Sequence, residues 1–348
     1  MKIIVDAMGG DNAPSATVRG ALQANREFGH DIILVGRGEE ILRVLNEDGL
    51  GQLPSGIEIA HADQVVDNHD NPATAFREKK DSSLTIGLKM LKDGAGDAFV
   101  SAGSTGAILS AATLLVKRIR GIRRAALCPV VPNGKGGSVL IDCGANAECT
   151  AEFLLQFAFM GSYYAGHVLG RPEPRVGLLN IGGEESKGDG LRKAAFDLLK
   201  QAGDEGRINF TGNVEGREAV AGEVDVIVAD GFAGNVFLKT VEGTGMFLAG
   251  EIKKMFKKSW KSKLGALLVQ DGIADFKKLL DYREVGGTAL IGISKPVIKA
   301  HGSSDAYAIR SAIRQAGQVA SSGIIDDISA HIDEMKVSVH KEGGETEE

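Results

Sequence analysis

The feature that most constrains the fold is an alternation of short apolar runs with longer segments of helical periodicity. Strand-length apolar runs occur at residues 2–7, 31–36, 57–60, 98–101, 139–142, 176–180, 208–211 and 224–229, with a weaker one at 289–293. Helical patterns fill the intervals at residues 16–28, 39–45, 84–92, 106–117, 151–165 and 191–201. Such an alternation predicts an α/β fold in which helices cover both faces of a mostly parallel sheet.

No internal repeat and no Pro/Ser-rich linker divides the 348 residues. We therefore expect a single α/β domain over residues 1–334. Two regions depart from the alternation. Residues from about 234 to 280 are typical of a long helical excursion, and residues 335–348 form an acidic, Gly- and Glu-rich tail that is expected to fray.

Charge and cysteine usage restrict the class of protein. The formal net charge of -6 argues against nucleic acid as a partner of the whole surface. No apolar stretch approaches the roughly 20 residues that cross a bilayer, and Met1-Lys2 runs directly into a strand pattern without a signal-peptide core. The three cysteines, Cys128, Cys143 and Cys149, form no Cys-x-x-Cys pair. These features predict a soluble, cytoplasmic protein with reduced thiols.

Six loops combine small residues with hydroxyl, amide or carboxylate groups, each just before a helix begins. They lie at residues 6–14, 101–107, 142–146, 180–189, 230–235 and 301–305. Ligands of open α/β sheets bind beyond the carboxyl ends of the strands. Glycines let backbone N–H groups approach an anion, and a helix N-terminus adds the positive end of its dipole. One such loop is most often a capped turn, but six of them favour an anion site.

Within these loops, Ser101, Ser104 and Thr105 offer hydroxyls for a phosphate and Lys187 offers a cation. The alternative to such an anion site is covalent catalysis in which Cys143 or Cys149 acts as the nucleophile. Neither cysteine has a histidine nearby in sequence, so this alternative is less favoured.

Familiar cofactor signatures are incomplete in this sequence. Residues 36–41 lack the third glycine of a dinucleotide loop, and residues 234–240 lack the glycine before the lysine of a phosphate-binding Walker loop. The sequence contains no His-Glu-x-x-His and no clustered ligand set. We therefore expect neither an organic cofactor nor a metal.

Taken together, the loops resemble the phosphate acyltransferase family of bacterial phospholipid synthesis, which makes acyl phosphate from acyl-acyl-carrier-protein. The matching stretches are residues 5–14, 79–83, 101–107, 142–146, 178–188, 229–236, 284–287 and 300–304. Each stretch is modest, but the ordered set covers almost the whole chain and is specific. The sequence departs from the family pattern at Ser104, Cys143, Gly183, Ser186 and Asp189.

The resemblance implies a three-layer α/β/α sandwich, a homodimer, no cofactor, and peripheral association with the inner face of the membrane. It implies that inorganic phosphate attacks the thioester directly. The implied roles are phosphate binding by Ser101, Ser104, Thr105 and Asn146, charge neutralisation by Lys187, carbonyl contacts by Asn180 and Asn235, and proton handling by Asp230 and His301. For His301 a purely structural place at the start of a helix, beside Ser303 and Ser304, is an equal alternative.

The helical excursion carries a basic segment that ends in an apolar tip. Between residues 251 and 263, six lysines and one glutamate give a net charge of +5, so the remainder of the chain carries -11. The contact residues we expect are Lys254, Lys257, Lys258, Trp260, Lys261, Leu264, Leu267 and Leu268. Such a protruding basic helical hairpin suits an anionic membrane surface or an acidic acyl carrier protein. A solvated helix of a dimer is the alternative.

Two other functions remain open. A phosphotransacetylase that acts on short acyl-coenzyme A would share the fold and the phosphate loops. A catalytically inactive scaffold, recruiting lipid enzymes to the membrane through residues 251–269, would not need the loops around Ser101 and Lys187. A decarboxylating dehydrogenase would need a metal-binding aspartate cluster, which the sequence does not indicate.

Overall fold

The computed structural model describes residues 1–273, 276 and 286–336. The end of the predicted helical excursion, residues 274–275 and 277–280, therefore lies outside the described residues, as do residues 284–285 of one family stretch and the predicted tail from residue 337. Met335, at the start of the predicted tail, is buried.

A seven-stranded sheet forms the first half of the molecule, with the order β3-β2-β1-β4-β12-β11-β5. Its strands are β1 (Lys2–Asp6), β2 (Asp31–Gly36), β3 (Ile57–His61), β4 (Ala98–Ser101), β5 (Ala126–Cys128), β11 (Gly287–Ile291) and β12 (Val297–Ala300). All neighbours are parallel except β11, which is antiparallel to both β12 and β5. Ile3 and Ile4 are both fully buried on opposite faces of β1, because parallel sheets are covered on both sides.

A five-stranded sheet forms the second half, with the order β6-β7-β10-β8-β9. Its strands are β6 (Val130–Val131), β7 (Ser138–Ile141), β8 (Val176–Leu179), β9 (Phe210–Val214) and β10 (Val226–Val228). Only the β6–β7 pair is antiparallel. The chain passes from the first sheet to the second at Pro129, between β5 and β6.

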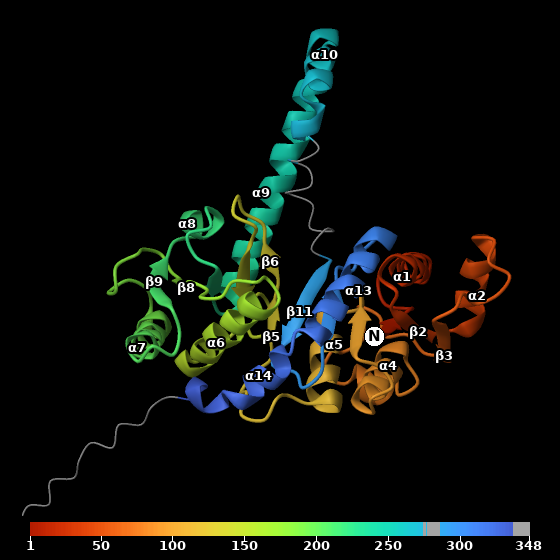
Figure 1. The fold of residues 1–348 in the computed structure, drawn as a ribbon, viewed down its shortest axis with the longest axis horizontal. Coiled ribbons are helices and arrows are strands. Elements are labelled where there is room, and N and C mark those ends of the chain that lie inside the picture. The colour runs from red at the N-terminus through yellow and green to blue at the C-terminus, as the bar shows by residue number, and fades with distance from the viewer. Residues whose placement is uncertain (274–275, 277–285, 337–348) are drawn as a thin grey trace, which may run out of the picture.

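Helices pack on the faces of both sheets (Figure 1). They are α1 (Ser15–Phe28), α2 (Gly38–Glu47), α3 (Ala75–Glu78), α4 (Ser83–Lys92), α5 (Thr105–Ala111) with the π-helical segment Ala112–Val116, α6 (Ala151–His167), α7 (Gly190–Asp204), α8 (Gly216–Val220), α13 (Ala306–Ser321) and α14 (Ile324–Ala330), followed by a 3-10 turn at Ile332–Met335. Helices α1 and α13 approach closely at Gly20, where a β-carbon would lie 2.6 Å from the Ala306 carbonyl oxygen. Only glycine permits that approach.

The remaining helices form the predicted excursion. Helix α9 (Gly231–Lys257) begins beside the second sheet and projects away from both sheets, with α10 (Trp260–Leu268) at its outer end (Figure 1). Within α9 only Gly231 and Gly234 are buried, so most of its length is not covered by the rest of the chain.

The predicted α/β class is confirmed, and every predicted strand and helix is present, most of them with shifted ends. The largest shifts are of three residues, at the end of β9, which is Val214 where residue 211 was expected, and at the end of α7, which is Asp204 where residue 201 was expected. The strands divide between two sheets where one was expected. The reason is that β5, β6 and β12 were not predicted, because two to four residues beside a proline carry no readable periodicity.

Candidate active site

Three loops of the first sheet pack against one another at the carboxyl ends of β1, β4 and β12. The Asp11 amide donates to the Gly302 carbonyl at 2.8 Å, and the Asn12 side chain donates to the carbonyls of Ser303 and Ser304 at 3.1 and 3.2 Å. A β-carbon on Gly9 would lie 2.5 Å from an Asp6 carboxylate oxygen, so this position accepts no side chain. The loops at residues 6–14 and 301–305 are therefore held together, although they stand at opposite ends of the sequence.

Ser101, predicted to bind phosphate, is turned toward the protein interior. Its hydroxyl donates to Oδ2 of Asp6 at 2.7 Å and accepts the Gly103 amide at 3.0 Å. Burial raises the pKa of Asp6, and hydrogen bonds from Ser83 and Ser101 act in the opposite direction. The structure therefore gives Ser101 a partner within the fold, and its predicted contact with phosphate stays a prediction.

Ser104 and Thr105 lie at the start of α5. Ser104 is half-buried and its side chain makes no capping hydrogen bond, while Thr105 is exposed. Gly106 lies against Pro72, since a β-carbon there would come within 2.9 Å of the proline ring. These two residues lie at the carboxyl end of β4, and their predicted contact with phosphate stays a prediction.

Asn146 belongs to a loop that is organised around a buried carboxylate in the second sheet. Asp142 accepts the amides of Leu127, Cys143 and Asn146 at 2.9, 2.7 and 2.7 Å. The Asn146 side chain donates to Asp142 and to the Ala125 carbonyl. Burial raises the pKa of Asp142, against the effect of these hydrogen bonds. Asn146 therefore orients the loop through Asp142, a residue that the sequence reading did not select.

Asp230 is the N-cap of α9. One carboxylate oxygen accepts the amides of Phe232 and Ala233 at 3.0 and 2.9 Å, and the other forms an ion pair with Arg192. The following Gly231 amide donates to the Asn146 carbonyl at 2.8 Å. The structure therefore brings Asp230 and Asn146 together, and it adds Arg192, which no sequence signal indicated.

Asn180 and Lys187 share one loop. The Asn180 side chain donates to the Lys187 carbonyl at 3.2 Å and to Asn213 at 3.0 Å, so it fixes the loop. The Lys187 ammonium has a loose contact of 3.9 Å with Glu184, and its side chain is 46% exposed. Because it is only weakly paired, Lys187 is free to move toward an incoming anion.

The two halves of the site come within electrostatic reach of each other at Lys239 of α9 and His301, which follows β12. Asn235 lies beside Gly144, and one turn later Lys239 pairs with Glu242 at 2.7 Å. Burial lowers the pKa of His301, and the positive charges of Lys239 and Lys299 lower it further. His301 also contacts the Ser303 hydroxyl at 2.8 Å. Lys299 was missed because its strand was not predicted.

The cysteines are not placed as nucleophiles. Cys143 and Cys128 are buried, and burial raises the pKa of both thiols. Burial likewise raises the pKa of Cys149 to about 11. Since the thiolate is the reactive form, these thiols are unreactive near neutral pH.

The predicted membrane or carrier-protein residues lie on the projecting helices. Lys254, Lys257, Lys258, Trp260, Lys261, Leu264, Leu267 and Leu268 are all exposed. Trp260 and Leu268 are 71% and 80% exposed, and the Lys261 ammonium lies 5.8 Å from the centre of the Trp260 ring. The structure thus gathers large apolar side chains and lysines at the outer end of α9 and on α10.

The described residues offer neither a metal site nor a membrane-spanning helix. They contain no group of three or more His, Cys, Asp or Glu side chains arranged to hold a metal ion. None of the described helices is long and apolar enough to span a membrane.

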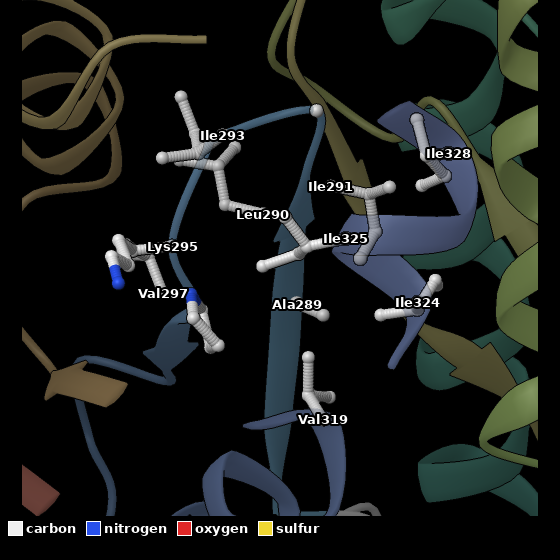
Figure 2. A pocket seen from close by; sticks show the side chains of 12 residues that line it. Ala289, Leu290, Ile291, Ile293, Lys295, Val297, Val319, Ile324, Ile325 and Ile328 are labelled. Atoms are coloured by element: carbon white, nitrogen blue, oxygen red, sulfur yellow. The ribbon is translucent and has the colours of Figure 1, made fainter. Parts of the chain in front are cut away.

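Figure 2 shows an apolar pocket where β11 residues such as Ile291 face Ile324 and Ile328 of α14. Its volume of about 10 Å³ is too small for an acyl chain.

Solved structures with a similar fold include phosphotransacetylases. The chain superposes on a phosphotransacetylase from Streptococcus pyogenes with a TM-score of 0.65 and 19% identity, covering 92% of this chain and 94% of the other. At that identity the likeness describes the fold alone.

Sequence relatives match over nearly the full length. A phosphate acyltransferase of Alkaliphilus oremlandii is 46% identical over 335 residues, covering 96% of this chain and 98% of the relative. One of Thermoanaerobacterium thermosaccharolyticum is 42% identical over 333 residues, covering 96% and 97%. The family model described as "Fatty acid synthesis protein" matches residues 1–327. This chain therefore belongs to the fatty acid synthesis protein family.

Proposed function

We propose that this protein is a phosphate acyltransferase that moves a long-chain acyl group from acyl carrier protein to inorganic phosphate. The observation that carries the proposal is the near-complete match to relatives named phosphate acyltransferase at 42–46% identity. The anion-handling loops at the ends of β1, β4, β7, β8, β10 and β12 support it. The acyl phosphate serves phospholipid synthesis.

In the proposed reaction a phosphate oxygen attacks the thioester carbonyl carbon. A C–O bond forms, the C–S bond breaks, and the proton of the phosphate goes to the departing carrier thiolate. The products are acyl phosphate and the free carrier thiol. A thiol has a pKa near 8.5, so it leaves without strong acid assistance, and catalysis consists mainly of positioning and of stabilising the oxyanion.

We assign the roles according to the contacts of each side chain. Ser104, which makes no capping hydrogen bond, and the exposed Thr105 offer their hydroxyls to phosphate. Lys187 stabilises the developing negative charge, because its ammonium is loosely held. Asn235 donates to the carbonyl oxygen.

Four other side chains hold these groups in place. Ser101 and Asn146 act through the buried carboxylates of Asp6 and Asp142, and Asn180 acts through the Lys187 carbonyl. Asp230 positions the start of α9, and His301 is the candidate for proton transfer.

The projecting helices are the proposed contact with the membrane and with the carrier protein. Exposed lysines attract anionic lipid or an acidic carrier, and the leucines of α10 enter the interface. The protein would then be cytoplasmic and peripherally bound to the inner face of the membrane.

We also propose that a second copy of the chain covers α9. Phe247 and Met246 are 64% and 68% exposed in the middle of this helix, well away from α10. Large apolar side chains in such a row are typical of a homodimer contact. A sedimentation-equilibrium measurement of Phe247→Asp should give the monomer mass, while the parent gives twice that mass.

A second candidate is a phosphotransacetylase that acts on short acyl-coenzyme A. The likeness of fold to the Streptococcus pyogenes enzyme favours it. The exposed apolar tip on α10 favours the long-chain reaction, because a short soluble donor has no need of a membrane contact.

One assay separates the candidates. The protein is incubated with phosphate and either palmitoyl-carrier protein or acetyl-coenzyme A, and acyl phosphate is measured by trapping with hydroxylamine. We expect product from the first donor only, with full activity in a chelator. Acetyl phosphate as the main product would establish the second candidate. Activity abolished by the chelator and restored by a divalent ion would contradict a metal-free mechanism.

A further inference from the structure

Lys299 occupies an unusual place in the first sheet. It lies on β12 in register with Ser101 of β4 on one side and Thr288 of β11 on the other. Its side chain is half-buried, and its ammonium donates to the carbonyl of the next residue, Ala300. Within the described part of the chain, no carboxylate lies at ion-pair distance from it.

A half-buried ammonium without a carboxylate is energetically costly. Burial favours the neutral amine, and it lowers the pKa of Lys299 to about 8. Buried charges in proteins are normally paired. The cost of burying this unpaired charge is relieved either when the ammonium loses its proton or when an anion binds beside it. Lys299 is therefore prepared to receive a negatively charged ligand.

Further positive charge surrounds the same point. Lys239 approaches from α9, and its charge lowers the pKa of both Lys299 and His301, which places the three groups within electrostatic reach of one another. Two acids face this group: Asp11 from the loop after β1, and Glu242, which is already paired with Lys239 at 2.7 Å. Neither acid forms an ion pair with Lys299.

The position is also correct for a ligand. Residues 299–301 lie at the end of β12, next to the end of β4, and the adjoining Gly302 carbonyl accepts the Asp11 amide of the loop after β1. Lys239 of α9 acts electrostatically on both Lys299 and His301, and one turn before it Asn235 lies beside Gly144 of the second half. A ligand held by Lys299 and Lys239 would contact groups from both halves of the molecule.

We propose that Lys299, together with Lys239 and His301, binds the inorganic phosphate that attacks the acyl donor. This inference rests on the proposed function and adds the location of its second substrate. Lys187, on the loop after β8, is then left to act at the thioester oxygen. The charge of Lys299 also sets a pH limit, since phosphate binding should weaken as the pH rises through about 8.

The experiment measures phosphate binding separately from catalysis. Equilibrium dialysis with radiolabelled inorganic phosphate is carried out on the intact protein without acyl donor. Lys299→Met, which keeps the apolar stem, should weaken binding by about tenfold or more, and Lys299→Arg should restore much of it. Lys295→Met is the matched control, because Lys295 is an exposed lysine on the turn just before β12. It should bind phosphate like the parent.

Kinetics and a second variant complete the test. In the acyl phosphate assay, Lys299→Met should raise the KM for phosphate and leave the KM for the acyl donor nearly unchanged. Lys239→Gln should raise the phosphate KM several-fold. In the parent, added phosphate should raise the pKa of His301, followed by NMR and assigned with His301→Gln, because a bound anion favours the imidazolium. If Lys299 were purely structural and no phosphate bound beside it, added phosphate would leave the pKa of His301 unchanged.

The outcomes separate the two proposals. If the parent makes acyl phosphate and Lys299→Met keeps the parent's phosphate affinity and KM, the inference is wrong and the function stands. If phosphate binds through Lys299 but no donor yields acyl phosphate, the site stands and the function is wrong. Should Lys299→Met fail to fold, Lys239→Gln and the His301 titration decide: no change in either overturns the phosphate site.

Discussion

The hydroxyl of Ser101 donates a hydrogen bond of 2.7 Å to the carboxylate of Asp6, and the two residues are only 1% and 2% exposed. This pair joins the ends of two adjacent strands, β1 and β4, below the loops of the candidate site. A buried carboxylate that loses one of its donors pays a large desolvation penalty.

Ser101→Ala should therefore lower the free energy of unfolding by about 1–3 kcal/mol, measured by urea denaturation. Ser104→Ala is the control, because its hydroxyl makes no capping bond and its loss should change stability by less than about 0.5 kcal/mol. A Ser104→Ala protein that is less stable than the Ser101→Ala protein would contradict the structural role assigned to Ser101.

Lys187→Ala should reduce kcat by roughly 100-fold while the fold survives. The reason is that Lys187 is the weakly paired cation on the loop fixed by Asn180. Lys200→Ala removes a lysine of similar exposure that is paired with Glu185, and it should keep parental kinetics. Parental kinetics in a folded Lys187→Ala protein would remove this lysine from the site.

Cys143→Ser and Cys149→Ser should each retain activity. Burial raises the pKa of both thiols, that of Cys149 to about 11, so little thiolate is present at pH 7. Mass spectrometry of the parent after brief mixing with acyl donor should detect no acyl-cysteine. A trapped acyl-enzyme, lost in one of the variants together with turnover, would establish a covalent route.

Leu267→Glu combined with Leu268→Glu should release the protein from anionic vesicles, while activity on soluble substrate remains. The two leucines are 61% and 80% exposed at the tip, and their transfer into the interface adds to the attraction of the lysines. Co-sedimentation with vesicles measures binding, and added salt should weaken that of the parent. Leu42→Glu, an exposed leucine on α2, is the control. Unchanged binding of the double variant would assign the tip to another contact.

Lys299→Met should stabilise the protein at pH 7, and this gain should disappear in alkali. The pKa of Lys299 falls from 10.5 to about 8 on folding, so below pH 8 the folded protein carries the full penalty of the buried charge. As the pH rises from 8 to 10.5 only the folded state loses this proton, and the penalty is relieved. The gain is on the order of 3 kcal/mol at most. Urea denaturation at pH 7 and pH 10.5 measures it. An equal effect at both pH values would indicate a packing change instead.

The sequence predicted those strands and helices whose residues follow one pattern over several consecutive positions. Ile3, Ile4 and Val5 predict a central strand because all three are apolar and a polar, glycine-rich loop follows. By contrast, Val130–Val131 is too short to be recognised, and Lys299 interrupts the apolar run of β12. For the same reason, the sequence predicted neither the division into two sheets nor the position of Lys299.

The partners of the site residues could not be predicted at all. Asp230 was expected in the loop at residues 230–235, but its ion pair with Arg192 joins residues 38 positions apart. Likewise, the pairing of Asp6 with Ser101 spans 95 positions. Contacts of that kind depend on the order of strands in the sheet, which local patterns do not encode.

Helix α9 runs without interruption through 27 residues, from the cap at Asp230 to Lys257. At 1.5 Å per residue it is a rod of about 40 Å. If α10 rests on a bilayer, this rod sets the height of the catalytic loops above the lipid. An acyl phosphate formed at those loops cannot then reach the bilayer while it is still bound, and it must be handed over across that gap. Adding or removing four residues within α9 would change the height by about 6 Å and leave the cap and the loops untouched.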